Sequence, residues 1–168
     1  MVAMTEITRL PTRPGTAMSL SAAGLSVLVL SLGSPTAAVV SLLAGVTLAG
    51  GLTRGSRRVL DVAGGLYFLS LVAAGVGTAG VEILLLAAIT SILAWDIGEN
   101  ALSVGDHLGR ETETTRLEVV HAATTVLVLT VGAGVVFALG LAASGGQPVT
   151  AVVLLLVGVI ALVAGMRR

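Results

Sequence analysis

Seven residues with side chains suited to acid–base chemistry or metal binding lie close together in the middle of the chain. They are Asp96, Glu99, Asn100, Asp106, His107, Glu118 and His121. Carboxylates and imidazoles together can hold a divalent metal, with the histidines as the specific ligands. The spacing permits such a site without being diagnostic, because no His-Glu-x-x-His motif and no paired aspartates are present. We therefore predict a polar cluster that is solvated or bound to a partner, with no catalytic, metal or cofactor-binding residue assigned.

His121 is the strongest single candidate for chemistry. It follows Glu118 by three residues, at a depth where Asp61 and Asp96 of neighbouring helices can meet it. A partly buried imidazole beside carboxylates can relay protons near neutral pH. The alternative is a structural histidine at the membrane interface, bonded to Glu118 or to a backbone carbonyl. We favour this alternative, because only threonines continue the polar path along the same apolar run.

The composition indicates a membrane protein. Hydrophobic residues make up 55% of the chain and charged residues 11%, whereas about a quarter of the residues in a soluble domain are charged. Cysteine is absent, which excludes disulfides and thiolate ligands. The formal net charge of zero offers no basic excess for nucleic acid. Membrane lipid is therefore the expected surrounding, and a nucleic-acid partner is not expected.

The basic residues indicate the topology. All nine are arginines, and they fall only in alternate gaps between the apolar runs. Arginine near membrane segments is retained on the cytoplasmic side, so the pattern predicts an all-α, polytopic bundle of six transmembrane helices in the cell membrane, with both termini inside. The arginines are Arg9, Arg13, Arg54, Arg57, Arg58, Arg110, Arg116, Arg167 and Arg168.

The apolar runs place the helices of a single membrane domain over residues 17–166. A polar cytoplasmic tail precedes it at residues 1–16, where two prolines and a glycine act as breakers. At the start of the third helix, we expect Asp61 to pair with Arg57 or Arg58. The predicted helices cover residues 17–33, 37–52, 59–77, 81–97, 117–143 and 149–166.

The fourth helix is predicted to continue beyond the membrane. Helical periodicity persists after Trp95, with one apolar and one polar face, and Gly109 ends it. Thr115 and Glu118 then have the form of a capping box that starts the fifth helix. The extension therefore reaches about residue 108. Its apolar face consists of Ala94, Ile97, Ala101, Val104 and Leu108.

The second helix carries small residues at spacings of four, namely Ala37, Ser41, Gly45 and Ala49. Small residues at this spacing allow the backbones of two membrane helices to approach closely. We predict that this stripe lies against another helix and serves packing.

Several segments resemble an uncharacterised family of haloarchaeal multi-pass membrane proteins. The likeness lies in residues 94–110 and 118–122, in the Arg-Gly-Ser-Arg-Arg loop at 54–58 and in the Gly-Gly-Gln-Pro turn at 145–148. The resemblance implies the fold of a membrane protein. It implies no activity, so no functional residue is carried over.

Two functions from different classes fit the sequence. The first is a structural or accessory membrane subunit that docks a membrane or cytoplasmic protein partner through its cytoplasmic segment 95–116. The second is a small-solute transporter or a subunit of a transport complex. Transporters usually have broken helices or polar residues at the midplane, whereas these helix centres contain mainly Leu, Val, Ala and Gly with isolated Ser and Thr. The accessory role is therefore favoured, and no catalytic motif points to an enzyme.

Overall fold

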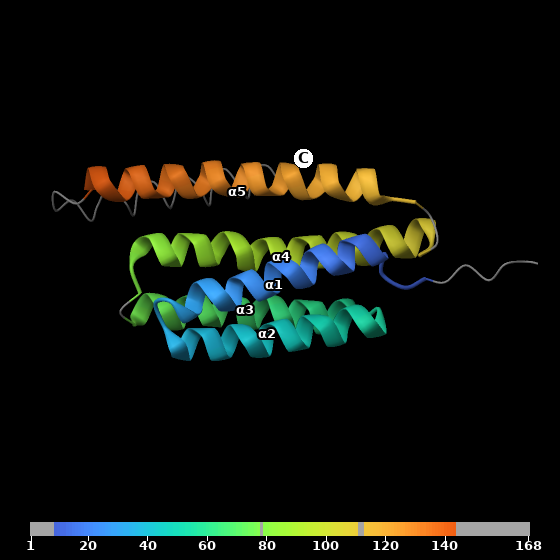
Figure 1. Cartoon of the computed structure of the whole chain (residues 1–168), viewed down its shortest axis with the longest axis horizontal. Coiled ribbons are helices and arrows are strands. Elements are labelled where there is room, and N and C mark those ends of the chain that lie inside the picture. The colour runs from blue at the N-terminus through green and yellow to red at the C-terminus, as the bar shows by residue number, and fades with distance from the viewer. Residues whose placement is uncertain (1–8, 78, 111–112, 144–168) are drawn as a thin grey trace, which may run out of the picture. The chain divides into compact units, whose positions relative to one another are not determined.

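The computed structural model describes residues 9–77, 79–110 and 113–143, which form five helices with no strand among them (Figure 1). Each helix is long and apolar enough to cross a membrane, which supports a helical membrane bundle. The predicted sixth helix, residues 149–166, lies outside the described residues. The helices are α1 (Arg13–Ser31), α2 (Pro35–Arg54), α3 (Arg57–Val76), α4 (Val81–Leu108) and α5 (Thr115–Ala143).

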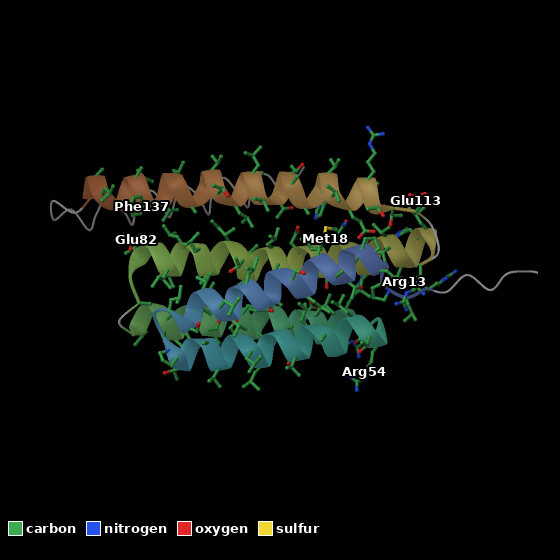
Figure 2. The ribbon with its side chains drawn as sticks, in the orientation of Figure 1. Arg13, Met18, Arg54, Glu82, Glu113 and Phe137 are labelled. Carbon is green, nitrogen blue, oxygen red and sulfur yellow. The ribbon has the colours of Figure 1, made fainter. Side chains whose placement is uncertain are left out.

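The first four helices form an up-and-down bundle joined by short turns. Around the bundle, α1 packs against α2 and α4, and α3 packs against the same two helices. Arg13 and Arg54 lie at one end of these four helices, and Glu82 lies at the other (Figure 2). We call the first of these the arginine end. It contains the starts of α1 and α3 together with the ends of α2 and α4.

Prolines start two of the helices. Pro14 and Pro35 both stand in a first turn, where the missing N–H has no helical partner to lose. Ser34 caps α2, because its Oγ accepts a hydrogen bond from the Ala37 N–H at 3.3 Å. The predicted tail to residue 16 is therefore too long. Residues 13–16 are the first turn of α1. Proline disrupts the interior of a helix but is accepted in its first turn, where Pro14 stands.

The turn between α2 and α3 is shorter than the sequence predicts. Gly55 has a φ of 63°, a left-handed conformation that glycine adopts without steric cost. The Ser56 N–H then donates to the Gly51 carbonyl at 3.0 Å, which satisfies an orphan carbonyl of α2. Only Gly55 and Ser56 lie outside the helices, so Arg54 and Arg57 are both helical.

Small side chains bring the helices together. Ala22, Ala23, Ala44, Ala63 and Ala94 meet in one core cluster with larger residues from the same bundle. Alanine has a small side chain, so the backbones of two helices can approach closely and gain van der Waals contact. The larger members of the cluster are Leu48, Leu52, Leu60, Tyr67 and Leu102.

The predicted packing stripe of α2 is partly enclosed. Ala37 and Ser41 are fully buried, whereas Gly45 and Ala49 are half-buried. A Cβ on Gly45 would lie 3.6 Å from Tyr67 Oη and 3.7 Å from the Ala23 Cβ, so this position faces both α3 and α1. These are ordinary contact distances. The position has room for a methyl group and for little more.

Large apolar side chains point outward, which is the reverse of a water-soluble protein. Leucines, valines and one phenylalanine are more than half exposed along α1 to α5. In a bilayer the lipid chains solvate these side chains, so their exposure carries no hydrophobic cost. Examples are Leu28, Val46, Phe68, Leu127 and Val136.

The chain divides inside α5, between Leu129 and Thr130. Up to Leu129, α5 belongs to the same unit as α1 to α4 and contacts them through polar side chains near its start. In the second unit, the described residues 130–143 continue the helix, and most of their side chains are exposed.

Candidate functional site

The fourth helix is longer than its partners in the bundle. Its 28 residues span about 42 Å, whereas the 20 residues of α3 span about 30 Å, close to the thickness of a hydrocarbon core. α4 begins at Val81 and ends at Leu108, where the sequence predicts the end of the amphipathic extension. Gly109 follows with a φ of 81° and stops the helix. About two turns of α4 therefore continue past the length needed for a span.

The buried face of this extension differs from the predicted one. Ile97 and Ala101 are buried, but Val104 is only half-buried and Leu108 is 51% exposed. Protein therefore covers the predicted apolar face at Ile97 and Ala101 but leaves it largely open at Leu108. The other buried residues of the extension are ones that the sequence pattern does not include, namely Gly98, Leu102 and Gly105.

Glycines allow neighbouring segments to approach the extension closely. A Cβ on Gly98 would lie 3.1 Å from Ser19 Oγ, and a Cβ on Gly105 would collide with the Leu10 carbonyl oxygen. Both glycines lie on one face of α4, and their lack of a side chain lets α1 and the residues before it approach that face closely. A hydropathy pattern gives glycine little weight, and for this reason the sequence does not indicate that Gly98 and Gly105 are buried.

Arg57 joins the start of α3 to the extension of α4. Its Nη1 lies 3.6 Å from Glu99 Oε2, and its Nη2 lies 4.0 Å from Asp106 Oδ2. The sequence predicts a partner for Asp61 in Arg57 or Arg58, but the ion pairs of Arg57 reach across to α4. Both pairs are partly exposed, so each stabilises the fold by about 0–1 kcal/mol. They nevertheless fix the charged face of α4 next to α3.

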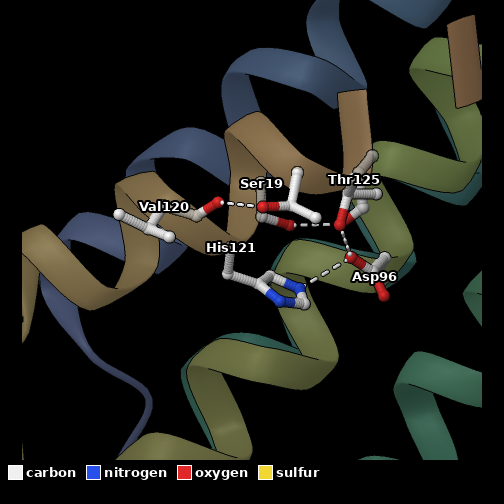
Figure 3. Close-up of polar contacts among 7 residues, drawn as sticks. Ser19, Asp96, Val120, His121 and Thr125 are labelled. Atoms are coloured by element: carbon white, nitrogen blue, oxygen red, sulfur yellow. Dashed lines mark hydrogen bonds and ion pairs between the residues drawn. The ribbon is translucent and has the colours of Figure 1, made fainter. Parts of the chain in front are cut away.

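Asp96 meets α5 at two points. Its Oδ2 lies 2.8 Å from His121 Nε2 and accepts a hydrogen bond from Thr125 Oγ1 at 2.9 Å. Figure 3 shows the carboxylate of Asp96 between these two side chains. The histidine thus contacts a carboxylate of a neighbouring helix, and neither Glu118 nor a backbone carbonyl takes that place. Asp61 lies on α3 and is exposed.

Glu118 is the one acidic residue of the candidate cluster that is buried, with 1% of its surface exposed. Its carboxylate accepts a hydrogen bond from Thr12 Oγ1 at 2.9 Å and another from Thr114 Oγ1. A buried carboxylate is costly unless such donors replace water. The predicted capping box is wrong, because Thr115 already belongs to α5 and Thr114 bonds the carboxylate instead.

The residues before α1 are part of this arrangement. Thr12 is fully buried, and its N–H donates to the Ala101 carbonyl of α4 at 3.3 Å. Gly15 allows the contact, since a Cβ there would collide with Glu118 Oε2 and Ala101. Thr12 therefore links the start of α1 to both α4 and α5. The sequence signal for it is a threonine two residues before Pro14, which is typical of an N-cap.

The remaining candidates stay apart. His107 is exposed, and its Nδ1 lies 2.7 Å from the Ser103 carbonyl of its own helix, while Asn100 is half-buried. Glu118 and His121 have the Glu-x-x-His spacing of some metal sites, yet their side chains contact different partners. Over residues 9–77, 79–110 and 113–143, no three His, Cys, Asp or Glu side chains gather as a metal site. The seven residues therefore form several separate contacts.

A second polar group lies inside the bundle. Ser26 of α1 is hydrogen-bonded to Ser41 of α2 at 2.9 Å and to Ser91 of α4 at 2.7 Å, and all three are buried. Ser19 also donates to the Ala94 carbonyl of α4 at 2.6 Å. Sequence reasoning missed this serine triad, because it treats Ser41 as packing surface and the other two as isolated. Serines satisfied by one another tie three helices together without a charge.

Comparison with known proteins identifies a family. The model of a family of unknown function, DUF7519, matches residues 9–163. No curated protein and no solved structure matches the chain. The matched range contains every residue of the contacts described above.

Proposed function

The chain belongs to DUF7519, a family of unknown function, and we propose that it is a multi-pass accessory protein of the cell membrane whose segment 95–116 docks a partner protein. The observation that carries the proposal is the length of α4, which continues about two turns beyond a membrane span as one helix. Such a projection is available to a protein outside the bilayer.

The tip of this projection is exposed while its base is fixed. Arg57 and Thr12 hold the base through the contacts to Glu99 and Ala101. A surface that is ordered before binding loses little conformational freedom when a partner docks. The exposed residues of the tip and the following turn are Asp106, His107, Leu108, Glu113 and Arg116.

The arginine distribution supports a cytoplasmic position for this surface. Arg13, Arg54, Arg57 and Arg58 all stand at the end of the bundle from which α4 projects. Arginines next to membrane segments are retained on the cytoplasmic side. We therefore propose a cytoplasmic partner, or a membrane partner with a cytoplasmic face. Lipid surrounds the rest, and no nucleic acid is involved.

The same contacts argue against an enzyme. Asp96, Glu118 and His121 are each engaged by side chains of the chain itself. A catalytic acid or base needs hydrogen-bond reach to a substrate in a cleft. Among the described residues, the polar side chains at the arginine end hold helices together, so a structural use accounts for them.

A second candidate function is a small-solute transporter or a subunit of one. Its support is the contact of Asp96 with His121 and Thr125, since an imidazole beside a carboxylate at a membrane interface is suited to proton relay. Reconstituted protein that moves protons or a solute, and stops when Asp96→Asn is introduced, would favour this function over docking.

Affinity capture from native membranes tests the docking function. The tagged protein should retain a partner in fixed stoichiometry, and the double variant Asp106→Asn with His107→Gln should lose it without a change in thermal stability. Glu82→Gln at the opposite end of the bundle is the control and should retain the partner. Equal retention by all three proteins, or no partner in any of them, would contradict the proposal.

A further inference from the structure

A groove of about 130 Å³ lies between α3 and α4. Its lining is mainly apolar, with three aromatic side chains and one serine, Ser91. It opens to the outside of the bundle, where Phe68 is 66% exposed and Trp95 is 37% exposed. The lining includes Gly64, Tyr67, Phe68, Leu71, Ile92 and Trp95.

Gly64 shapes this groove. A Cβ on Gly64 would lie 3.1 Å from both Cδ1 and Nε1 of Trp95, so the indole rests directly on the α3 backbone. Gly65, the next residue, would meet nothing within 4 Å. The two glycines therefore differ in a way that an experiment can use, because only the first contacts the groove wall.

An apolar space of this size suits hydrocarbon. Cavities of about 150 Å³ lined by apolar side chains stay dry and bind small hydrocarbons. The groove lies on the outward surface of helices that are apolar enough to cross a membrane. Lipid chains are the hydrocarbon present at such a surface.

Charged residues stand where the groove reaches the arginine end. Asp61 precedes Gly64 by three residues on α3, and Glu99 follows Trp95 by four residues on α4, so each continues its groove-lining face. Arg57 is paired there with Glu99 and Asp106. Arg58 precedes Asp61 by three residues on α3, so this end of the groove carries arginines as well as acids.

Glu99 also has unused bonding capacity. Its Oε1 is buried and has no hydrogen-bond partner within the described parts of the chain. Its Oε2 lies 3.6 Å from Arg57, a long ion pair. A buried acceptor without a partner is costly, and the Glu99 side chain is 23% exposed, so turning Oε1 toward a donor at the surface would gain the bond. Because the atom is a carboxylate oxygen, a phosphate cannot donate to it, whereas an ammonium group donates a charge-assisted hydrogen bond.

We propose that this groove binds one membrane lipid with an amino head group. Its hydrocarbon chain lies between α3 and α4 against Trp95, and its ammonium group donates to Glu99 Oε1. The site is independent of partner docking at the tip of α4, because it faces the lipid and requires no second protein.

Trp95 reports on the site directly, because it is the one tryptophan of the chain. The full-length protein is reconstituted in bilayers of brominated phosphatidylcholine, which quench its fluorescence. Unbrominated phosphatidylethanolamine is then added, with phosphatidylglycerol and phosphatidylcholine as comparisons. We expect the amino lipid to restore fluorescence with about tenfold preference over the other two, the factor that one hydrogen bond to a charged group contributes.

Variants separate the head group from the chain. Glu99→Gln should reduce the preference for phosphatidylethanolamine to that of phosphatidylcholine while quenching by brominated chains persists. Gly64→Ala should weaken the preference by narrowing the groove, and Gly65→Ala should leave it unchanged. Phe68→Ala removes an exposed wall of the groove and should weaken the preference without loss of folding.

Two results would overturn the proposal. Recovery of fluorescence in proportion to mole fraction for every head group would mean that Trp95 meets only bulk lipid. Fluorescence that brominated bilayers do not quench would mean that protein covers the groove, either another part of this chain or a second copy.

Discussion

His121 Nε2 lies 2.8 Å from Asp96 Oδ2, so the fifth helix meets the fourth through an imidazole and a carboxylate. Thr125 adds a second hydrogen bond to the same oxygen one turn further along α5. In the unit that ends at Leu129, these contacts and the bonds of Glu118 attach the start of α5 to the bundle. Polar contacts thus hold the helices together at the arginine end. Inside the bundle, alanine packing and serine hydrogen bonds do the same.

The two histidines should differ in their effect on stability. His121→Ala removes the contact with Asp96 between two helices, and we expect it to lower the free energy of unfolding by about 1–3 kcal/mol. His107→Ala removes only a contact with the histidine's own helix at an exposed site, so its effect should stay within about 0.5 kcal/mol. Denaturant unfolding in detergent measures both. Equal losses would show that the contact with Asp96 contributes nothing.

The serine triad should behave as one unit. Ser26→Ala breaks two hydrogen bonds between helices, each of which contributes about 0.6 kcal/mol on average in membrane proteins, so we expect a loss of about 1 kcal/mol. Ser21→Ala is the matched control, because Ser21 is exposed and bonds only the Ala17 carbonyl of α1. A double-mutant cycle of Ser26→Ala and Ser91→Ala should show coupling. Strictly additive losses would argue that the two hydroxyls do not interact.

Glycine substitutions should separate packed faces from lipid-facing ones. Gly51→Ala places a Cβ against Leu60 and should destabilise the protein by about 1–3 kcal/mol. Gly24→Ala meets nothing within 4 Å and should be neutral, or stabilising by up to about 1 kcal/mol through helix propensity. At Gly45, alanine should fit, whereas isoleucine should cost about 1–3 kcal/mol. Thermal unfolding in detergent ranks the variants, and a destabilised Gly24→Ala would contradict the assignment of faces.

Much of this arrangement is predictable from the sequence, because helix length and arginine placement follow from bilayer physics. The apolar runs indicate α1 to α5 with small errors at their ends, and Gly109 marks the end of α4. The start of α1 is the largest error among these helices. Pro14 is a helix breaker in an interior and a helix starter in a first turn, and the local sequence does not show which applies.

The side-chain contacts were harder to predict, since they depend on how the helices rotate against one another. A meeting of Asp96 with His121 is among the expected possibilities, whereas the bonds of Glu118 to Thr12 and Thr114 are not. Threonine and serine have modest hydropathy. Thr12 and the serine triad therefore do not stand out from the apolar runs in the sequence. Their partners become apparent only once the helices are packed.

Cysteine labelling should establish the orientation in the membrane. The chain has no cysteine, so single substitutions report one position each. We expect Thr36→Cys, at the start of α2, to react with an impermeant reagent added outside the cell. Ser56→Cys and Glu113→Cys should react only after the membrane is opened, if the arginine end faces the cytoplasm as proposed. Labelling of Thr36→Cys and Ser56→Cys from the same side would refute the topology.

The central claim is that the tip of α4 binds a protein, and site-specific photocrosslinking tests it most directly. A benzophenone amino acid replaces His107, which is exposed at the tip, and in a second protein it replaces Phe68, which is exposed on the apolar surface of α3. The variant labelled at position 107 should form one discrete protein adduct in native membranes, and the one labelled at position 68 should form none. The absence of an adduct at position 107, or the same adducts at both positions, would contradict the proposed docking function.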